Sequence, residues 1–213
     1  MKLFILIYLI LFYGLAFFWR SYVTWRATGV NPYRLTQTDG LMSFLGRLYR
    51  LVSLGSVAAV LLYILAPTRW YAYLGPLTWL EGAAVTAVGV TLLVLAFIWV
   101  LVAQVHMGNS WRIGIDEENE TTLVTGGLFR FSRNPIFLGM RLNLLGLFLV
   151  MPNALTLALW LLGDVAIQMQ VFLEEAYLQR QHGDAYRQYQ AVTPRYLGLP
   201  GRRTQPQPDQ SRG

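Results

Sequence analysis

The sequence predicts an all-α integral membrane protein with about five transmembrane helices. Hydrophobic residues make up 55% of the 213 residues and only 13% are charged, and the mean hydropathy is +0.42. Several apolar runs approach or exceed the roughly 18 residues that a membrane-spanning helix needs. Most of the basic residues fall between these runs rather than inside them. This composition is too apolar for a soluble globular protein of this length.

The apolar run over residues 1–19 is expected to be a retained span rather than a cleaved signal peptide. No small-x-small cleavage site follows it, whereas an aromatic and basic belt does, as at a membrane interface. Pro152 and Asn153 predict a tight turn between the last two spans. A polar helix, interrupted near His182 and Gly183, is expected over residues 174–199. The five predicted spans cover residues 1–19, 48–66, 82–105, 135–151 and 154–173.

Lysine and arginine are unevenly distributed over the two sides that these spans define. Fourteen fall in residues 20–50, in residues 106–135 and after residue 174, against two on the opposite side. The positive-inside rule then places the C-terminus in the cytoplasm, and we expect a multi-pass integral membrane protein. Topology and anionic lipid headgroups explain the net charge of +6 better than nucleic acid does. The chain has no cysteine, which excludes thiolate metal sites, and we expect no metal.

Two ionisable residues fall inside the last two predicted spans. Arg141 and Asp164 stand about equally far from the predicted turn at residues 152 and 153, so they should lie at similar depth. A charge inside a membrane costs roughly 2.5 to 3.5 kcal/mol on insertion scales, and pairing is the usual remedy. We favour a structural ion pair, with the lining of a polar cavity as the alternative.

A polar, Gly-rich and basic stretch over residues 121–139 separates two of the apolar runs. It contains Arg130, Arg133 and the Asn134–Pro135 step, so a polar ligand could be held there. The cytoplasmic end of the last span brings amide and acid groups toward the same level. Converging groups of this kind over an apolar bundle are typical of a binding site, although ordinary interfacial charges at a helix end remain an alternative. The residues at that helix end are Gln170, Glu174 and Glu175.

Residues 123–139, Leu-Val-Thr-Gly-Gly-Leu-Phe-Arg-Phe-Ser-Arg-Asn-Pro-Ile-Phe-Leu-Gly, resemble the signature of isoprenylcysteine carboxyl methyltransferases and their bacterial relatives, including phospholipid methyltransferases. Residues 108–112 resemble the motif that precedes this signature in bacterial members, and this resemblance implies a bacterial inner membrane as the location. The resemblance covers about residues 104–197. Downstream it continues with the family's ending, which corresponds here to Glu174, Glu175, Gly183, Tyr186, Tyr189 and Arg195.

The resemblance implies a membrane enzyme that binds S-adenosyl-L-methionine without a Rossmann fold and methylates a lipidic or isoprenoid substrate among membrane lipids. Carried over by position, the cofactor would be bound by Leu123, Val124, Phe129, Asn134, Pro135, Ile136, Phe137 and Glu174. Arg133 and Glu175 are the candidate catalytic residues, to hold an anionic group and to act as a base. His106 and His182 are weaker candidates for the base. Arg112 and Gln170 are the candidate substrate-binding residues, and Gln170 stands where eukaryotic members place a substrate-contacting arginine.

The chain departs from the family pattern at three positions of the signature. Asn134 replaces a histidine, and Phe129 and Phe137 replace tyrosines. Two alternatives follow. The same stretch is similar to the C-terminal motif of NADPH-dependent membrane reductases of the sterol and steroid type, and the departures would also suit a non-catalytic membrane scaffold. We therefore divide the chain into N-terminal spans with a basic cytoplasmic loop (1–103), a methyltransferase-like catalytic region (104–199) and a disordered tail (200–213).

Overall fold

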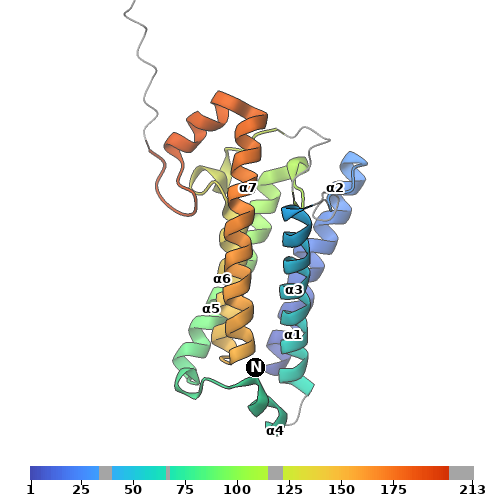
Figure 1. The fold of residues 1–213 in the computed structure, drawn as a ribbon, viewed down its shortest axis with the longest axis vertical. Coiled ribbons are helices and arrows are strands. Elements are labelled where there is room, and N and C mark those ends of the chain that lie inside the picture. Colours follow the sequence, from blue (N-terminus) through green and yellow to red (C-terminus); the bar gives the residue numbers. More distant parts are fainter. Residues whose placement is uncertain (34–39, 66–67, 115–121, 202–213) are drawn as a thin grey trace, which may run out of the picture.

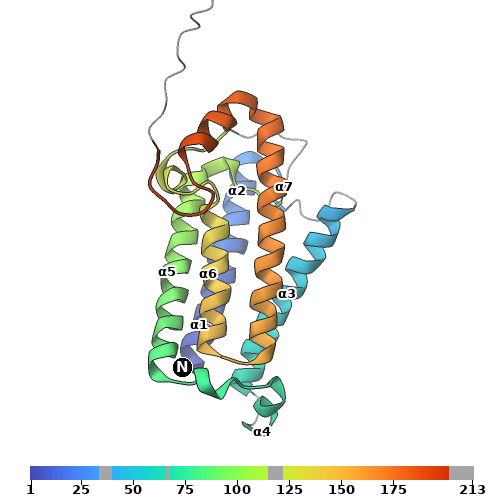
Figure 2. The same cartoon turned by 60° about the vertical axis from the view of Figure 1, so that its left-hand side comes forward.

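The computed structural model describes residues 1–33, 40–65, 68–114 and 122–201, and these residues form a bundle of long helices (Figure 1). The N-terminus and the short α4 (Thr68–Tyr71) lie at one end, whereas the loops after α5 (Ala83–Met107) and α7 (Ala154–Val192) lie at the other, here called the site end (Figure 2). No strand occurs within the described residues. The helices are α1 (Lys2–Leu11), η1 (Phe12–Trp19), α2 (Arg20–Thr28), α3 (Leu41–Leu65), α4 (Thr68–Tyr71), η2 (Ala72–Leu74), η3 (Thr78–Leu80), α5 (Ala83–Met107), η4 (Gly108–Ser110), η5 (Gly127–Arg130), α6 (Pro135–Val150) and α7 (Ala154–Val192).

Four helices in the described part of the chain are long and apolar enough to cross a membrane, which confirms an all-α integral membrane protein. They cover Lys2–Thr28, Leu41–Leu65, Ala83–Ser110 and Ala154–Val192. The fourth predicted span corresponds to α6, which has 16 residues. At 1.5 Å per residue α6 is about 24 Å long, shorter than the roughly 30 Å hydrocarbon core. Because α6 is shorter, the loop that precedes it can lie closer to the middle of the bundle than the ends of the longer helices do.

The first helix extends beyond its predicted end at Trp19. The π-helix η1 runs into α2, and the helix ends at Gly29, which has φ +70°. The aromatic and basic residues after Trp19 mark a membrane interface, but they do not stop a helix. A glycine in the left-handed conformation does, because it closes the last turn without a Cβ clash.

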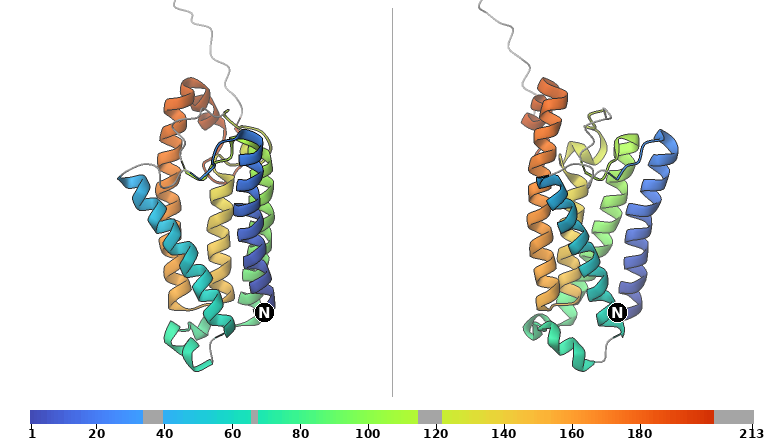
Figure 3. Two further views of the ribbon diagram at one scale, coloured as in Figure 1. Left: turned by 90° about the vertical axis from the view of Figure 1, so that its right-hand side faces the viewer. Right: turned by 45° about the vertical axis from the view of Figure 1, so that its right-hand side comes forward.

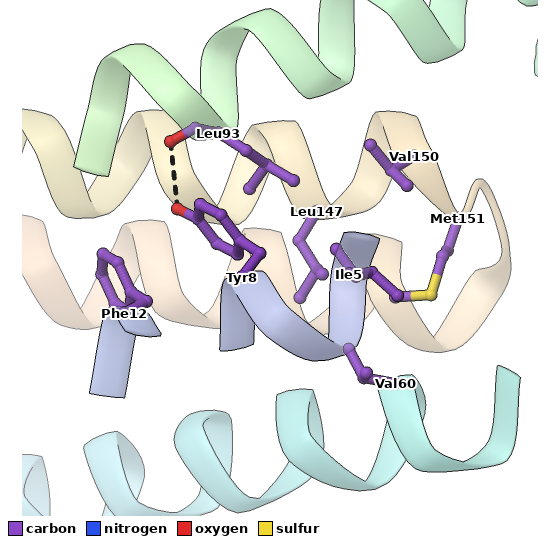
Figure 4. Packing of buried hydrophobic residues seen from close by; sticks show 8 residues of the cluster. All are labelled: Ile5, Tyr8, Phe12, Val60, Leu93, Leu147, Val150 and Met151. Atoms are coloured by element: carbon purple, nitrogen blue, oxygen red, sulfur yellow. Dashed lines mark hydrogen bonds between the residues drawn. The ribbon is translucent and has the colours of Figure 1, made fainter. Parts of the chain in front are cut away.

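An apolar core joins the first helix to α3, α5 and α6 at the end opposite the site (Figure 4). Tyr8 is 8% exposed, and its hydroxyl donates a hydrogen bond to the Leu93 carbonyl of α5 at 3.1 Å. The same hydroxyl is hydrogen-bonded to Asn143 of α6. These contacts hold the first helix against α5 and α6, the helices on either side of the loop that carries the site. The core residues are Ile5, Tyr8, Phe12, Val60, Leu93, Leu147, Val150 and Met151.

Helices α5 and α6 pack closely through facing glycines. A Cβ placed on Gly146 would lie 3.0 Å from the Gly89 carbonyl oxygen, and one placed on Gly89 would lie 2.9 Å from the Val150 amide nitrogen. Small residues allow such approach between membrane helices, where dispersion contacts must replace the hydrophobic effect. The contact fixes α6, and with it the start of the site, against α5.

The turn between α6 and α7 confirms the one predicted at residues 152 and 153. Asn153 caps α7, accepting a hydrogen bond from the Thr156 amide at 3.0 Å, and the Asn153 amide donates to the Thr156 hydroxyl at 3.3 Å. The hairpin brings Arg141 to 2.6 Å from Asp164, which confirms the structural ion pair. Non-helical angles at Gly183, φ +51° and ψ −122°, confirm the predicted interruption of α7. Apart from residues 200 and 201, the predicted tail lies outside the described residues.

Candidate functional site

The site end holds a cavity of about 430 Å³ and, beside it, a smaller pocket of about 70 Å³. The larger one is mainly lined by apolar and aromatic side chains, and its wall includes all of residues 133–137. The smaller one is walled by hydroxyl-bearing side chains together with Leu123 and Val124. The two adjoin, because they share lining residues. The shared residues are Met107, Arg112, Gly114, Phe129, Arg133 and Glu174.

A glycine and a histidine shape the loop between the two pockets. Gly127 has φ +57°, and a Cβ there would lie 2.5 Å from the His106 ring. The Leu128 amide donates a hydrogen bond to His106 Nδ1 at 3.2 Å. His106 therefore anchors the loop that begins η5. Next in the chain, Phe129 is 7% exposed, and its carbonyl accepts a 2.6 Å hydrogen bond from the Tyr189 hydroxyl of α7.

Arg133 joins this loop to the end of α7. Its Nη1 donates to the Thr193 carbonyl at 2.6 Å and to the Gln190 carbonyl at 3.2 Å. Its guanidinium also bonds to the Glu175 carboxylate, with Nη2 3.3 Å from Oε1. The Arg133 backbone amide donates to the Pro194 carbonyl at 2.9 Å. Although Arg133 lines both pockets, its side chain is thus largely occupied by protein partners.

Glu175 is the centre of this network and is 5% exposed. It accepts a hydrogen bond from Asn134 Nδ2 at 2.8 Å and lies 2.9 Å from Arg195 Nη2. The hydrogen bond to Glu175 raises the pKa of Arg195 above its ordinary value, so the arginine stays charged. Glu175 lines neither pocket. The structure thus brings together three predicted site residues, Arg133, Asn134 and Glu175, but turns the glutamate away from the cavity.

The residues after α7, 193–201, form a segment that we call the C-terminal strap. The strap contributes the Arg195 side chain, which pairs with Glu175. Its backbone groups form hydrogen bonds with the loop before α6. Asn134 Nδ2 and the Ser132 hydroxyl donate to the Arg195 carbonyl at 3.2 and 3.4 Å, and the Gly198 amide donates to the Phe131 carbonyl at 3.1 Å. The strap therefore holds residues 131–134 in place through these hydrogen bonds.

The larger cavity lies between the first helix and α3, which separate toward the site end (Figure 3). Phe18 and Leu54 line it and are 75% and 69% exposed. Since both belong to membrane-spanning helices, the cavity opens toward lipid. The residues that precede α5 in the chain and line the cavity are Tyr13, Phe17, Phe18, Ser21, Tyr33, Tyr49, Arg50, Ser53 and Leu54.

The structure distributes the sequence-predicted residues over both pockets. Leu123 and Val124 line the smaller pocket only. Asn134, Pro135, Ile136, Phe137 and Gln170 line the larger cavity, whereas Arg112, Phe129, Arg133 and Glu174 line both. Among the described residues, no group of three His, Asp or Glu side chains is arranged to hold a metal.

Sequence reasoning missed the walls contributed by the first helix and α3. Tyr49 and Ser53 are four residues apart and share one face of α3. This polar spacing in an apolar helix was the available signal. It does not by itself distinguish a cavity wall from an ordinary helix contact. The sequence also did not single out Tyr177 and Leu178 in the smaller pocket.

Comparison with known proteins agrees with the resemblance in the C-terminal half of the chain. A search of curated proteins and a search of solved structures each gave no significant match. The family model for phospholipid methyltransferase matches residues 83–185, from the start of α5 into the last part of α7. Residues 83–185 therefore match a family of the group of membrane methyltransferases that includes phospholipid methyltransferase and isoprenylcysteine carboxyl methyltransferase.

Proposed function

We propose that the protein is an S-adenosyl-L-methionine-dependent methyltransferase that acts on a lipidic or isoprenoid substrate at the membrane surface. The observation that carries this proposal is the junction of the two pockets at Phe129, Arg133 and Glu174. A two-substrate transfer needs both reactants held against each other. A small pocket with charged and hydroxyl-bearing side chains that meets a larger, mainly apolar cavity suits a polar donor and an apolar acceptor.

The residues at this junction fit S-adenosyl-L-methionine. Glu174 presents a carboxylate to both pockets, and a carboxylate is a good partner for the ammonium or ribose hydroxyls of the cofactor. Leu123, Val124 and Phe129 supply apolar surface for the adenine ring. When bound, the cofactor supplies an electrophilic methyl group carried on a sulfonium.

The protein's own contribution to such a reaction is positioning and the exclusion of water. Phe129 and the start of α6 would orient the two reactants, and the apolar wall would keep water from the reacting centre. Arg133 and Asn134 face the cavity but are held by Glu175. We therefore assign Glu175 the role of a positioning residue that fixes both of them, in place of the base expected from the sequence.

The match of residues 83–185 to the phospholipid methyltransferase family model supports a lipid as the acceptor. We also propose that the site end faces the cytoplasm, because lysine and arginine are concentrated in the segments that lie there. The cofactor would then reach the smaller pocket from water and the acceptor would reach the larger cavity from the bilayer.

Calorimetric titration of the detergent-purified full chain with S-adenosyl-L-methionine and, separately, with NADPH tests the proposal. We expect micromolar binding of the first, weakened by about tenfold or more in Glu174→Ala, because that change removes a charged hydrogen-bond partner. Asp184→Ala is the matched control, since Asp184 is exposed and lines neither pocket. Binding of NADPH alone would move the protein to the reductases, and binding of neither would favour the scaffold.

A further inference from the structure

The C-terminal strap is a closed loop that turns back along the bundle. At its ends, the Gly201 amide donates a hydrogen bond to the Val192 carbonyl at 2.7 Å, so the chain leaves the strap beside the last residue of α7. Between these ends the strap, red in Figure 1, descends toward the start of α6. We call its middle part, residues 196–199, the tip.

A tyrosine at the tip shows how far the strap descends. The Tyr196 hydroxyl is hydrogen-bonded to the Gln168 amide at 2.6 Å, and the Arg141 guanidinium of α6 lies 4.6 Å from the centre of the Tyr196 ring. At 1.5 Å per residue, Gln168 stands about 21 Å along α7 from Ala154. The tip therefore reaches the level of the membrane-spanning part of the α6–α7 hairpin.

The start of α7 lies at the opposite interface of the membrane. The Ala154 amide donates a hydrogen bond to the Gly75 carbonyl at 2.9 Å, which ties the helix start to an aromatic-rich segment. Tryptophan and tyrosine gather at membrane–water interfaces. A hydrocarbon core of about 30 Å that begins at Ala154 ends about 9 Å beyond Gln168. The tip is thus placed at the boundary of acyl chains and head groups on the site side. The exposed aromatic residues of the segment are Trp70, Tyr73 and Trp79.

The tip exposes apolar side chains at this depth. Leu197 and Leu199 are 65% and 87% exposed. Phe131 and Phe172, in the two segments that the strap contacts, are 39% and 56% exposed. The Arg195 guanidinium lies 4.6 Å from the centre of the Phe172 ring, so the strap rests on an outward-facing aromatic residue of a membrane-spanning helix. Apolar surface gathered in this way is typical of a contact with a protein or a membrane, and its depth favours lipid.

We propose that the C-terminal strap is a re-entrant membrane segment whose tip inserts Leu197 and Leu199 among the acyl chains of the leaflet at the site end. Non-helical backbone is tolerated at membrane depth where protein groups satisfy it. The Gly198 amide and the Arg195 carbonyl are both hydrogen-bonded to residues 131–134. The inference goes beyond the proposed function and does not depend on it.

Spin labelling of single cysteines tests the depth of the tip. The chain has no cysteine, so each introduced cysteine is the only labelling site. Leu197→Cys and Leu199→Cys each carry a nitroxide in the full chain, reconstituted into dioleoylphosphatidylcholine vesicles. The collision rate of the label with oxygen, which concentrates among acyl chains, is compared with its collision rate with a water-soluble nickel chelate.

Two further positions on α7 calibrate the measurement. Val165→Cys is the lipid reference, because Val165 is 55% exposed on a membrane-spanning helix. Asp184→Cys is the water reference, because the Asp184 side chain is 84% exposed beyond the interruption at Gly183. We expect the ratio of oxygen to nickel collisions at both tip positions to be several-fold higher than at Asp184→Cys. The melting temperatures of the tip variants should equal that of the wild type, because the replaced side chains are exposed.

A ratio at both tip positions equal to that at Asp184→Cys would place the strap in water and overturn the proposal. Exclusion of both reagents from both positions would also overturn it, because protein, such as a second copy of the chain, would then cover the tip. These measurements involve neither cofactor nor acceptor. Their outcome is therefore independent of the titration with S-adenosyl-L-methionine, and failure of one proposal leaves the other standing.

Discussion

Two acidic residues of α7 bind arginines near α6, and they differ in burial and in the number of their partners. Among the residues that the structure describes, Asp164 pairs with Arg141 alone, at 2.6 Å, with side chains 30% and 25% exposed. Glu175 binds Arg133 and Arg195 and accepts from Asn134, and its own side chain is 6% exposed. The first pair joins two helices within the hairpin. The second network joins α7, the loop before α6 and the C-terminal strap at the edge of the cavity.

The difference teaches what each group does for the site. The Arg141–Asp164 pair neutralises two charges inside membrane-spanning helices and can be replaced as a unit by apolar side chains. Glu175 cannot be replaced in this way, because Arg133 and Arg195 would keep their charges beside each other. Its loss would release the loop that carries Asn134 and Pro135 into the cavity wall.

Glu175→Gln should have the largest effect of the changes considered. It keeps the shape of the side chain but leaves two arginines without their counter-charge, at a cost of roughly 3 kcal/mol in the free energy of unfolding. Thermal unfolding in detergent, followed by helical circular dichroism, measures this loss. Binding of S-adenosyl-L-methionine should weaken as well, because the loop at the junction of the pockets is no longer held.

The control for this experiment is Asp184→Asn. Asp184 also pairs with an arginine, Arg187, at 3.1 Å, but their side chains are 84% and 70% exposed. Exposed pairs contribute about 0 to 1 kcal/mol, so this variant should unfold nearly as the wild type does. If Glu175→Gln behaved like Asp184→Asn, the network would have no structural role.

The Arg141–Asp164 contact could be predicted because a helical hairpin converts sequence distance from the turn into depth. The approach of Glu175 to Arg133 and Asn134 followed from the same geometry. The strap could not be predicted in this way, because it acts largely through the backbone carbonyls of Thr193, Pro194 and Arg195. A pattern of side chains does not report such contacts.

The part of the cavity wall that α3 and α5 contribute could not be predicted from the sequence for a different reason. Tyr49 and Gln104 lie on two different helices, and their convergence depends on how α3 and α5 pack against α7. The first helix also continues past the aromatic belt at Trp19, since a belt marks lipid depth and not a helix end. Local periodicity predicts the helices, whereas the cavity between them is a product of tertiary packing.

Arg141→Leu should have an intermediate effect. It leaves Asp164 unpaired between two membrane helices and should cost about 2 kcal/mol. The double variant Arg141→Leu with Asp164→Leu should cost less than the single one, because it removes both charges. Unfolding of all three variants in detergent completes a double-mutant cycle. Purely additive losses would show that the two residues do not stabilise each other.

Tyr196→Phe should have the smallest effect and separates the strap from the ion pair. The Tyr196 hydroxyl is hydrogen-bonded to the Gln168 amide of α7 at 2.6 Å, and the Arg141 guanidinium lies 4.6 Å from the centre of the Tyr196 ring. Removing the hydroxyl should cost about 1 kcal/mol and leave the ring in place beneath the arginine.

Tyr196→Leu, which removes the ring as well, should cost about 1 kcal/mol more if the cation–π contact contributes. That extra loss should disappear when Arg141 is also replaced by leucine. If it persists, the ring stabilises the strap through packing alone. Glu175 would then be the one acid of α7 whose arginines connect the strap to the rest of the site, and the two acid clusters would be energetically independent.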